Sequence, residues 1–497
     1  MKVLLIDPPF YSFMGMQSRY FPIGLGYLAA CLRDRGHDVR IYSADASKQI
    51  QALDYSKMHD RYKIFIRHVN DPANSIWHDV AAVLKSFKPD VVGITAMTPK
   101  IASVLRTATV CKEYDGRLPV VIGGPHATIK PDEILKYKDV DFVVRGEAER
   151  AIVVLVDLLA KNDAGSLPGV SGLSYRKNGR ISHNDQRDYI EDLDSLPLPA
   201  RELLVHSEYY CPEDLSIIMT SRGCPFACTY CYKGMFARRV RYRAIGSVME
   251  EIKYVSRRYG AKQLAFKDDS FTVNKRRIVE LCDNLIAEAI KVNWECTTRV
   301  DVVSEHLLEK MMAAGCNTVK VGIESGSPRV LKMIKKRIDH EKVRAAAEMF
   351  NKYGLFWSSY FMMGLPDETE EDILSTVRFM KEVNPDYASI SVYEPYPGTE
   401  MFETGVELGL VKPQMNWPEY FDRPPDEYYL KDPRKRTNTI SHERFEAICE
   451  AVLKEFDSHN KSLKRIAKRA LARRKTYYYE PRSLVRDVRR AARWIMS

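Results

Sequence analysis

Three closely spaced cysteines are the residues of this 497-residue chain whose types and spacing point most clearly to chemistry. Cys224, Cys228 and Cys231 form a CxxxCxxC pattern in the segment RGCPFACTYCY. Three thiolates at this spacing can ligate three irons of a [4Fe–4S] cluster and leave the fourth iron open. Structural zinc would need four ligands, and no fourth Cys or His lies at zinc spacing. A chance trio of core cysteines is disfavoured by the Gly-Cys-Pro turn and the flanking aromatics, so the pattern predicts an iron–sulfur site.

Length and composition favour a multidomain cytoplasmic protein. With 45% apolar and 29% charged residues, the 497-residue chain has enough material for several cores. No run of eighteen apolar residues occurs, so a membrane-spanning helix is not expected. The start, MKVLLIDPPF, has no small-residue cleavage site and is interpreted as a buried strand rather than a signal peptide. The remaining cysteines are interpreted as buried structural thiols: Cys31, Cys111, Cys211, Cys282, Cys296, Cys316 and Cys449.

Residues 1–160 alternate short apolar runs with helical patterns, which predicts a parallel, doubly wound α/β sheet. The apolar runs are KVLLID, DVRIYSAD, DVVGITAM, PVVIGGPH and DFVVRGE. Ligands of such sheets bind beyond the carboxyl ends of the strands. The residues expected there are Asp7, Pro8, Pro9, Thr95, Thr98, Gly123, Gly124, Pro125, His126, Gly146 and Glu147. No GxGxxG pattern opens the first helix, so a dinucleotide ligand is disfavoured.

A hairpin, a linker and a second series of strands and helices follow. Residues 171–184 contain an Asn-Gly pair typical of a hairpin turn, and an acidic, proline-punctuated linker comes next. Six strand patterns then alternate with helical patterns: LSIIMTS, QLAFKD, VNWECTT, TVKVGIE, FWSSYFMMG and YASISVYEP. Such an alternation of strands and helices predicts a β/α barrel, in which the catalytic residues lie at the carboxyl ends of the strands. Those ends are polar or glycine-rich here.

The cysteine triplet, with Tyr230 just before its last member, resembles the radical S-adenosylmethionine superfamily. The strand–helix series agrees with the partial (β/α)6 barrel of that superfamily. The resemblance implies that S-adenosylmethionine binds the open iron and is cleaved to a 5′-deoxyadenosyl radical. It also implies contacts to S-adenosylmethionine from Tyr230, Asp268, Asp269, Arg299, Gly322, Glu324, Gly326, Gly364, Pro366, Pro397 and Gly398. Each of these residues also fits a structural role, such as a helix cap or a turn.

The strand ends of the first domain resemble the cobalamin-binding domain that precedes the barrel in many radical S-adenosylmethionine enzymes. The matching pieces are DPPF, FPIGLGYLAACLRDRGHDV, GGPHAT and RGEAE. The resemblance implies a flavodoxin-like domain that contacts cobalamin through the strand-end residues named above. The DxHxxG element is absent, so cobalamin would be held without a protein histidine on cobalt, and His126 belongs to a contact loop. The alternative is a domain of the same shape that binds nothing.

We therefore expect four regions along the chain. They are a cobalamin-binding domain at 1–165, a hairpin and linker at 166–205, a radical barrel at 206–405 and a mostly helical region at 406–497. Within the last region, residues 412–441 are rich in aromatics, prolines and charges and could cover the barrel mouth. A helix is predicted from Ser441 to about Arg474.

The end of the chain is strongly basic. From Lys461 onward there are thirteen Lys and Arg against two acids, which accounts for the whole net charge of +10. A final helix places Leu484, Val488, Ala491 and Ile495 on one face. This helix either docks on its own domain, which we favour, or lies on an anionic membrane surface. RNA binding is disfavoured because no RNA-recognition motif accompanies the charge.

These inferences favour an enzyme that methylates an unactivated carbon or phosphorus centre. The deoxyadenosyl radical would abstract a hydrogen atom from the substrate, and methylcobalamin would donate its methyl group. The alternatives are a ring-forming or rearranging enzyme with the same cofactors and a non-catalytic cluster and cobalamin binding protein. Expected partners are a small-molecule substrate, including a lipid or other hydrophobic metabolite, and a flavodoxin or ferredoxin as electron donor. No nucleic acid is expected, and the location is cytoplasmic, with peripheral contact at the inner membrane surface if the final helix binds lipid.

Overall fold

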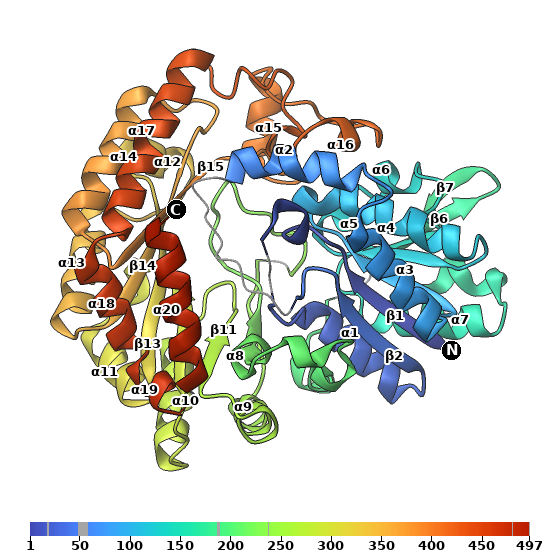
Figure 1. Ribbon diagram of the computed structural model, residues 1–497, viewed down its shortest axis with the longest axis horizontal. Coiled ribbons are helices and arrows are strands. Elements are labelled where there is room, and N and C mark those ends of the chain that lie inside the picture. The colour runs from blue at the N-terminus through green and yellow to red at the C-terminus, as the bar shows by residue number, and fades with distance from the viewer. Residues whose placement is uncertain (17–18, 48–57, 186–188, 237, 480, 497) are drawn as a thin grey trace.

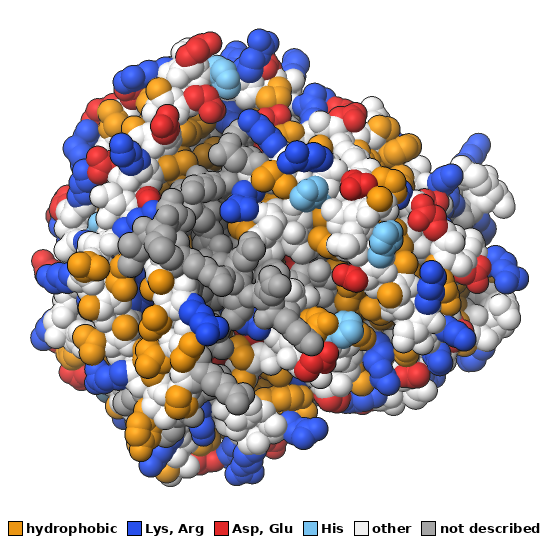
Figure 2. All heavy atoms as spheres, viewed as in Figure 1, with side chains coloured by type: hydrophobic (Ala, Val, Ile, Leu, Met, Phe, Trp, Pro, Cys, Tyr) orange, Lys and Arg blue, Asp and Glu red, His pale blue; other side chains and the backbone are white. Residues whose placement is uncertain are grey.

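Two largely parallel sheets lie side by side in the computed structural model, each with helices packed on it (Figure 1). The structure describes residues 1–16, 19–47, 58–185, 189–236, 238–479 and 481–496. The first sheet belongs to the N-terminal third of the chain and the second to its middle. The final helices then run along the second sheet, and on the face seen in Figure 2 Lys and Arg side chains lie interspersed with acidic and hydrophobic ones.

The first sheet has seven strands in the order β2-β1-β3-β4-β5-β6-β7, and its first five strands are parallel. These are β1 Lys2–Asp7, β2 Asp38–Ser43, β3 Val91–Thr95, β4 Val120–Gly123 and β5 Phe142–Val144. The hairpin strands β6 Leu173–Lys177 and β7 Arg180–His183 continue the sheet, with β6 antiparallel to β5 and β7 antiparallel to β6. Because β1 leads first to β2 and then to β3 on its other side, the sheet is doubly wound with its switch point between β1 and β3.

Side-chain alternation along the strands divides the core of this domain between two faces. Leu4 and Ile6 of β1 lie in one hydrophobic cluster, whereas Val3 and Leu5 lie in another. The first cluster includes residues of α2 Met58–Val69, α3 Ser75–Phe87, α4 Ile101–Tyr114 and α6 Pro131–Leu135. The second includes residues of α1 Ile23–Asp34 and α7 Glu149–Ala160, and the short helix α5 Pro125–Ile129 follows β4. The expected doubly wound α/β sheet, with helices on both faces, is therefore confirmed. Helix α2 was not expected, because its segment reads as polar, although Tyr62, Phe65 and Val69 are buried.

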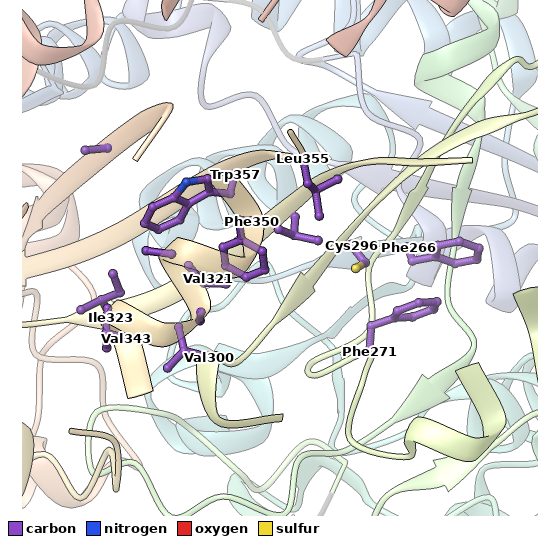
Figure 3. Close-up of a cluster of buried hydrophobic side chains, with 14 of the residues drawn as sticks. Phe266, Phe271, Cys296, Val300, Val321, Ile323, Val343, Phe350, Leu355 and Trp357 are labelled. Atoms are coloured by element: carbon purple, nitrogen blue, oxygen red, sulfur yellow. The ribbon is translucent and has the colours of Figure 1, made fainter. Parts of the chain in front are cut away.

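The second sheet is the six-stranded open barrel that the sequence predicts, in the order β15-β14-β13-β12-β11-β8 with every pairing parallel. Its strands are β8 Ile217–Ile218, β11 Gln263–Phe266, β12 Asn293–Thr298, β13 Cys316–Glu324, β14 Phe356–Met363 and β15 Tyr387–Val392. The outer helices are α9 Ile245–Tyr259, α10 Lys275–Ala287, α11 Glu305–Ala313, α12 Pro328–Met333, α13 His340–Lys352 and α14 Glu370–Val383. Outward-facing strand residues, including Cys296, Val321 and Trp357, pack with these helices in one continuous core (Figure 3).

A short antiparallel ribbon frames the segment that carries the three cysteines. Its strands are β9 Ser221–Arg222 and β10 Arg241–Tyr242, with Arg222 opposite Arg241. We call residues 223–240, which join the two strands, the cysteine loop. The four-residue helix α8 Pro212–Leu215 precedes β8.

After the barrel the chain returns to the first domain. Helices α15 Glu400–Glu407 and α16 Glu419–Asp422 belong to a segment, residues 400–430, that we call the return segment. Phe402, Tyr420, Tyr428 and Tyr429 join the hydrophobic cluster of α2 and α4. The Tyr420 and Tyr429 hydroxyls donate hydrogen bonds to the buried Glu133 carboxylate at 2.5 and 3.0 Å. The return segment thus completes the core of the first domain, and the expectation that residues 412–441 cover the barrel mouth stays a prediction.

The helix predicted from Ser441 to about Arg474 is divided in the structure. Helix α17 is His442–Asn460, because the Asn460 amide turns to β15 and bonds both the N–H and the C=O of Ala388. Helices α18 Leu463–Ala472, α19 Arg474–Tyr479 and α20 Pro481–Met496 follow. Among the described residues, no helix has the combined length and hydrophobicity to cross a membrane.

Candidate active site

The cysteine loop lies at the carboxyl ends of the barrel strands and is fixed by backbone hydrogen bonds. Cys228 is buried, Cys224 and Cys231 are partly exposed, and all three thiols are free. The N–H of Thr229 donates to Ile334 O at 3.1 Å, and its C=O accepts from Met401 N at 2.9 Å. The loop is therefore held between the end of α12 and the start of α15.

Cationic side chains lie near Cys228 and Cys231. The Arg299 guanidinium stacks 3.8 Å above the Phe226 ring of the cysteine loop and is held by Asp301 and by Lys336 O. Burial raises the pKa of the Cys231 thiol to about 11, while Lys233 and Lys336 act in the opposite direction. A cluster ligated by three thiolates is an electron-rich anionic group, so sulfur donors beside these cations fit a [4Fe–4S] cluster.

A cage for a single metal ion is a different arrangement. In the described part of the chain, no three His, Cys, Asp or Glu side chains are grouped closely enough to hold one ion. Ligands of one zinc ion must all lie about 2.3 Å from the same centre. Thiolates of a four-iron cluster bind different irons and are spread more widely, so the cysteine loop does not need such a cage.

Two predicted carboxylates at the end of β11 brace the strand that leads into the cysteine loop. The buried Asp268 accepts hydrogen bonds from the Thr220 N–H and from the Thr220 and Ser221 hydroxyls. Asp269 accepts from the N–H of Gly223, whose φ of 97° places it in the left-handed region. The buried Asp268 carboxylate thus forms its hydrogen bonds within the fold, whereas Asp269 is exposed beside the loop.

Glu324 stands out at the end of β13 because it has a φ of 75°, a conformation that costs energy for a residue with a side chain. Its Oε1 is 2.7 Å from Lys336 Nζ, which is 3.4 Å from the Tyr230 hydroxyl. A Cβ on Gly322 would lie 2.3 Å from the same Oε1, so only glycine leaves room for this pair. Glu324, Lys336 and Tyr230 therefore form one preorganised group next to the cysteines.

The other residues predicted to contact S-adenosylmethionine have packing partners that are distant in sequence. A Cβ on Gly326 would lie 2.5 Å from Ser375 O of α14, and one on Gly364 would lie 2.8 Å from the Phe445 ring. Pro366 is buried and its C=O accepts from Asn438 N, while Pro397 is also buried. A Cβ on Gly398 would lie 3.0 Å from the Tyr232 ring of the cysteine loop and 3.1 Å from Ile129 of the first domain. Gly398 thus marks the place where the loop, β15 and the first domain meet.

At the switch point of the first sheet, Asp7 is part of a buried ion-pair group. Lys100 Nζ is 2.8 Å from Asp7 Oδ1 and 3.5 Å from Asp45 Oδ2. The other Asp45 oxygen accepts from the N–H groups of Phe10 and Ser12 at 2.7 and 3.0 Å. Asp7 and Asp45 therefore shape the loop that contains the buried Pro8 and Pro9, and burial raises the pKa of Asp7.

The β3 and β4 ends combine glycine backbone with an exposed apolar side chain, which suits a large flat ligand. Gly124 has a φ of 100°, and a Cβ there would lie 2.9 Å from Ala96 O, whereas Met97 next to it is 50% exposed. His126 is fully buried, and its Nδ1 lies 3.1 Å from the Thr98 hydroxyl. Burial lowers the pKa of His126 to about 3, so it is a neutral core residue turned away from the surface. Partly exposed predicted residues at these ends are Thr95, Gly123 and Pro125.

Glu147, at the end of β5 beside Gly146, joins the two domains. Its carboxylate is 2.8 Å from Arg222 Nη1 and 2.7 Å from Arg241 Nη1, and it accepts from Ile190 N at 2.7 Å. Arg222 also pairs with Glu149 at 2.5 Å, and all four charged side chains are at most 7% exposed. Glu147 is therefore occupied by the ribbon around the cysteine loop. Sequence reasoning missed Arg222 and Arg241, because their carboxylate partners Glu147 and Glu149 are more than 70 residues away in sequence.

Comparison with known proteins agrees with this two-part site. Residues 218–380 match the Radical SAM superfamily and residues 16–156 match the B12 binding domain. An uncharacterized methyltransferase of Pyrococcus horikoshii is 35% identical over 84% of this chain and 86% of its own length. The anaerobic magnesium-protoporphyrin IX monomethyl ester cyclase of Rubrivivax gelatinosus is 29% identical over 82% of this chain and 70% of its own length.

A solved structure shares the fold across both domains. The radical S-adenosylmethionine methyltransferase TsrM from Kitasatospora setae, solved with tryptophan and a S-adenosylmethionine analogue, superposes with a TM-score of 0.64 at 18% identity. The match covers 83% of this chain and 77% of TsrM. The chain belongs to the radical S-adenosylmethionine enzymes that carry a B12-binding domain. Such an enzyme uses a [4Fe–4S] cluster, S-adenosylmethionine and cobalamin, and acts on a small-molecule substrate.

Proposed function

We propose that this enzyme methylates an unactivated carbon or phosphorus centre of a small molecule. The observation that carries the proposal is the ion-pair group of Glu147, Arg222 and Arg241. It fixes the ribbon around the three cysteines against the ligand-binding edge of the B12-binding sheet. A methyl donor on that sheet and a radical source on the barrel therefore face one shared space, as methyl transfer to a substrate radical requires.

Residues of this chain would position the cofactors and exclude water. Cys224, Cys228 and Cys231 supply the thiolates, and Glu324, held by Lys336, offers its carboxylate beside them. When bound, the cluster supplies the electron that cleaves S-adenosylmethionine, and methylcobalamin supplies the methyl group. The Glu324 geometry is set before any ligand arrives, so no reorganisation is needed in the reaction itself.

Ring formation or rearrangement with the same cofactors is the second candidate, because the Rubrivivax relative is a cyclase. Methyl transfer has the stronger support, since the more similar Pyrococcus relative, which this chain covers over 86% of its length, bears the name methyltransferase. A non-catalytic binding protein would have no use for the strained Glu324.

The deciding experiment is anaerobic reconstitution with iron, sulfide and cobalamin. The holoenzyme is incubated with reductant, methyl-labelled S-adenosylmethionine and metabolites of a cell extract. We expect 5′-deoxyadenosine together with a labelled product that is heavier by one methylene unit, and neither from Cys228→Ala. Formation of 5′-deoxyadenosine with an unlabelled, cyclised product would replace the proposal by the second candidate. Absence of 5′-deoxyadenosine from a protein with a full cluster would refute both.

Three further expectations belong to this proposal. A flavodoxin or ferredoxin would deliver the electron. Contact of the basic helix α20 with an anionic membrane surface is the less favoured alternative to docking on its own domain. Its exposed Leu484, Val485 and Val488 would supply the apolar contact, which would suit a lipid or other hydrophobic substrate. Binding of purified protein to anionic vesicles, compared with Val488→Asp, tests the membrane contact.

A further inference from the structure

The inward face of the barrel carries a group of charged and aromatic side chains that the cofactors do not require. Residues of β11, β12, β13 and β14 alternate, and Phe266, Trp294, Val319 and Val321, Trp357 and Phe361 belong to the outer core. The side chains between them therefore face inward. These are Lys267, Glu295, Lys320 and Tyr360.

Strand register places the two lysines at the same height. Ala265 pairs with Glu295 and Thr297 pairs with Lys320, so Lys267 comes level with Lys320 across one intervening strand. Two strand spacings separate their backbones by about 9–10 Å, a gap that two flexible lysine side chains can close around one small group. Glu324 lies four residues further along β13, which is about 13 Å towards the cysteine loop. The lysines thus lie deeper in the barrel than the group around Glu324.

Only one of the two lysines has an ion-pair partner among the described residues. Lys320 Nζ is 2.5 Å from Glu295 Oε1, but Lys267 is in no ion pair with any residue that the structure describes. The charge of Arg473 also helps to lower the pKa of Glu295. Arg473 itself, however, forms ion pairs with Glu213 and Asp487 at 2.8 and 2.7 Å. Lys267, Lys320 and Glu295 together therefore carry one net positive charge on the inner face.

Solvent reaches this group of inward-facing side chains. Lys267 is exposed and Tyr360 is 39% exposed, although burial lowers the pKa of Lys267 and raises that of Tyr360. Tyr20, which comes from the first domain and is 59% exposed, lies beside this group, with its ring centroid 5.6 Å from Lys267 Nζ.

We propose that Lys267 and Lys320 form an anion-binding subsite that takes a carboxylate or phosphoryl group of the substrate. This inference rests on the proposed function and narrows its substrate class to small molecules that carry an oxyanion. Lys267 would donate to the anion directly, and Lys320 would be shared between the anion and Glu295. Tyr360 and Tyr20 would contact the part of the substrate next to the anion.

The first test is calorimetric titration of the cluster- and cobalamin-loaded enzyme with inorganic phosphate and with acetate. We expect one of these anions to bind, with Lys267→Met weakening it about tenfold or more, because a charge-assisted hydrogen bond is lost. Lys253→Met is the matched control, since Lys253 lies on outer helix α9 and pairs with Glu288. Its affinity should equal that of the wild type.

Glu295→Gln shows whether Lys320 binds the anion or only forms a structural ion pair with Glu295. Removing this competing carboxylate frees Lys320, so the variant should bind the anion several-fold more tightly. A merely structural ion pair would give the opposite result, with both Lys267→Met and Glu295→Gln weakening binding together. That result, or equal affinity of wild type and Lys267→Met, overturns the inference.

Extract metabolites then distinguish the two sources of the anion. The methyl-labelled product should come from the fraction retained on an anion exchanger, and phosphatase treatment abolishes it if the group is a phosphate monoester but not if it is a carboxylate. A product found only in the unretained fraction overturns the inference while leaving the proposed function intact. If the cluster-loaded wild-type enzyme forms no 5′-deoxyadenosine, the proposed function is refuted. The calorimetric comparison still tests the anion subsite in that case, because it measures binding and needs no reaction.

Discussion

Glu147→Gln tests whether Glu147 contacts cobalamin, as the sequence implies, or holds the two domains together through buried ion pairs, as the structure shows. The motif places Glu147 among the cobalamin contacts, whereas the structure commits its carboxylate to Arg222 and Arg241. Hydrogen bonds from the two arginines outweigh burial and hold the pKa of Glu147 below its ordinary value of 4.5. The carboxylate is therefore ionised in the folded protein, and its contribution to stability is present above that value and is lost as the pH falls below it.

The expected effect is large because every partner is buried. The side chains of Glu147, Arg222 and Arg241 are 3–5% exposed, so an amide at position 147 would leave two guanidinium groups with only Glu149 as a carboxylate partner. Breaking a buried ion pair at one partner costs about 3–5 kcal/mol, which is a large fraction of the stability of an ordinary domain. The ribbon around the cysteine loop should loosen first.

Urea unfolding followed by circular dichroism measures this cost, and limited proteolysis near Arg241 reports the local loosening. Glu371→Gln is the matched control, because Glu371 and Arg378 form an ion pair whose side chains are 74% and 59% exposed. A cycle with Arg241→Met should show coupling to Glu147→Gln, since the two residues are in direct contact. If Glu147→Gln unfolds like the wild type yet fails to retain cobalamin, the reasoning is wrong and Glu147 is a cofactor contact.

Three further predictions follow from the same contacts. Cys228→Ala should abolish both the iron content and 5′-deoxyadenosine formation, whereas Cys449→Ala, which lies in the outer core, should keep both; equal iron in the two variants would contradict the site. Gly326→Ala should cost about 1–3 kcal/mol in urea unfolding, since its Cβ would lie 2.5 Å from a backbone carbonyl of α14, whereas Gly246→Ala in α9 meets nothing within 4 Å and should be neutral or stabilising. The pKa of His126 is about 3 in the fold against an ordinary 6.5, so the unfolded chain takes up the proton first and stability falls as the pH drops from 6.5 to 3. His126→Gln should flatten that slope; an unchanged slope would mean that the histidine is not buried in its neutral form.

The sequence predicts the parts of this molecule that are set by local patterns. Apolar runs and helical periods predicted both sheets and the alternation of their strands with helices such as α9, α13 and α14. The cysteine loop was found because its spacing is itself the chemical signal. The doubly wound order could be expected because parallel strands with intervening helices permit few topologies.

The roles of individual strand-end residues could not be predicted, because their partners are distant in sequence. His126 meets Tyr420 of the return segment, Gly364 meets Phe445 of α17, and Glu147 meets the ribbon. A one-dimensional pattern gives no sign of such contacts. For the same reason the break after Asn460 was missed: the amide prefers the backbone of Ala388 in β15, which no helical period reveals.

The path of the chain determines how the two cofactor sites are related. Two domains joined by one linker would ordinarily be free to move relative to one another. Here the chain passes from the first sheet through the barrel and back, and Phe402, Tyr420 and Tyr428 of the return segment are at most 2% exposed in the first domain's core. Separating the domains would therefore expose this aromatic packing and also break the Glu147 ion pairs. The fold itself thus fixes the distance between the cysteine loop and the B12-binding edge, as transfer between a radical source and a methyl donor held at these two places would require.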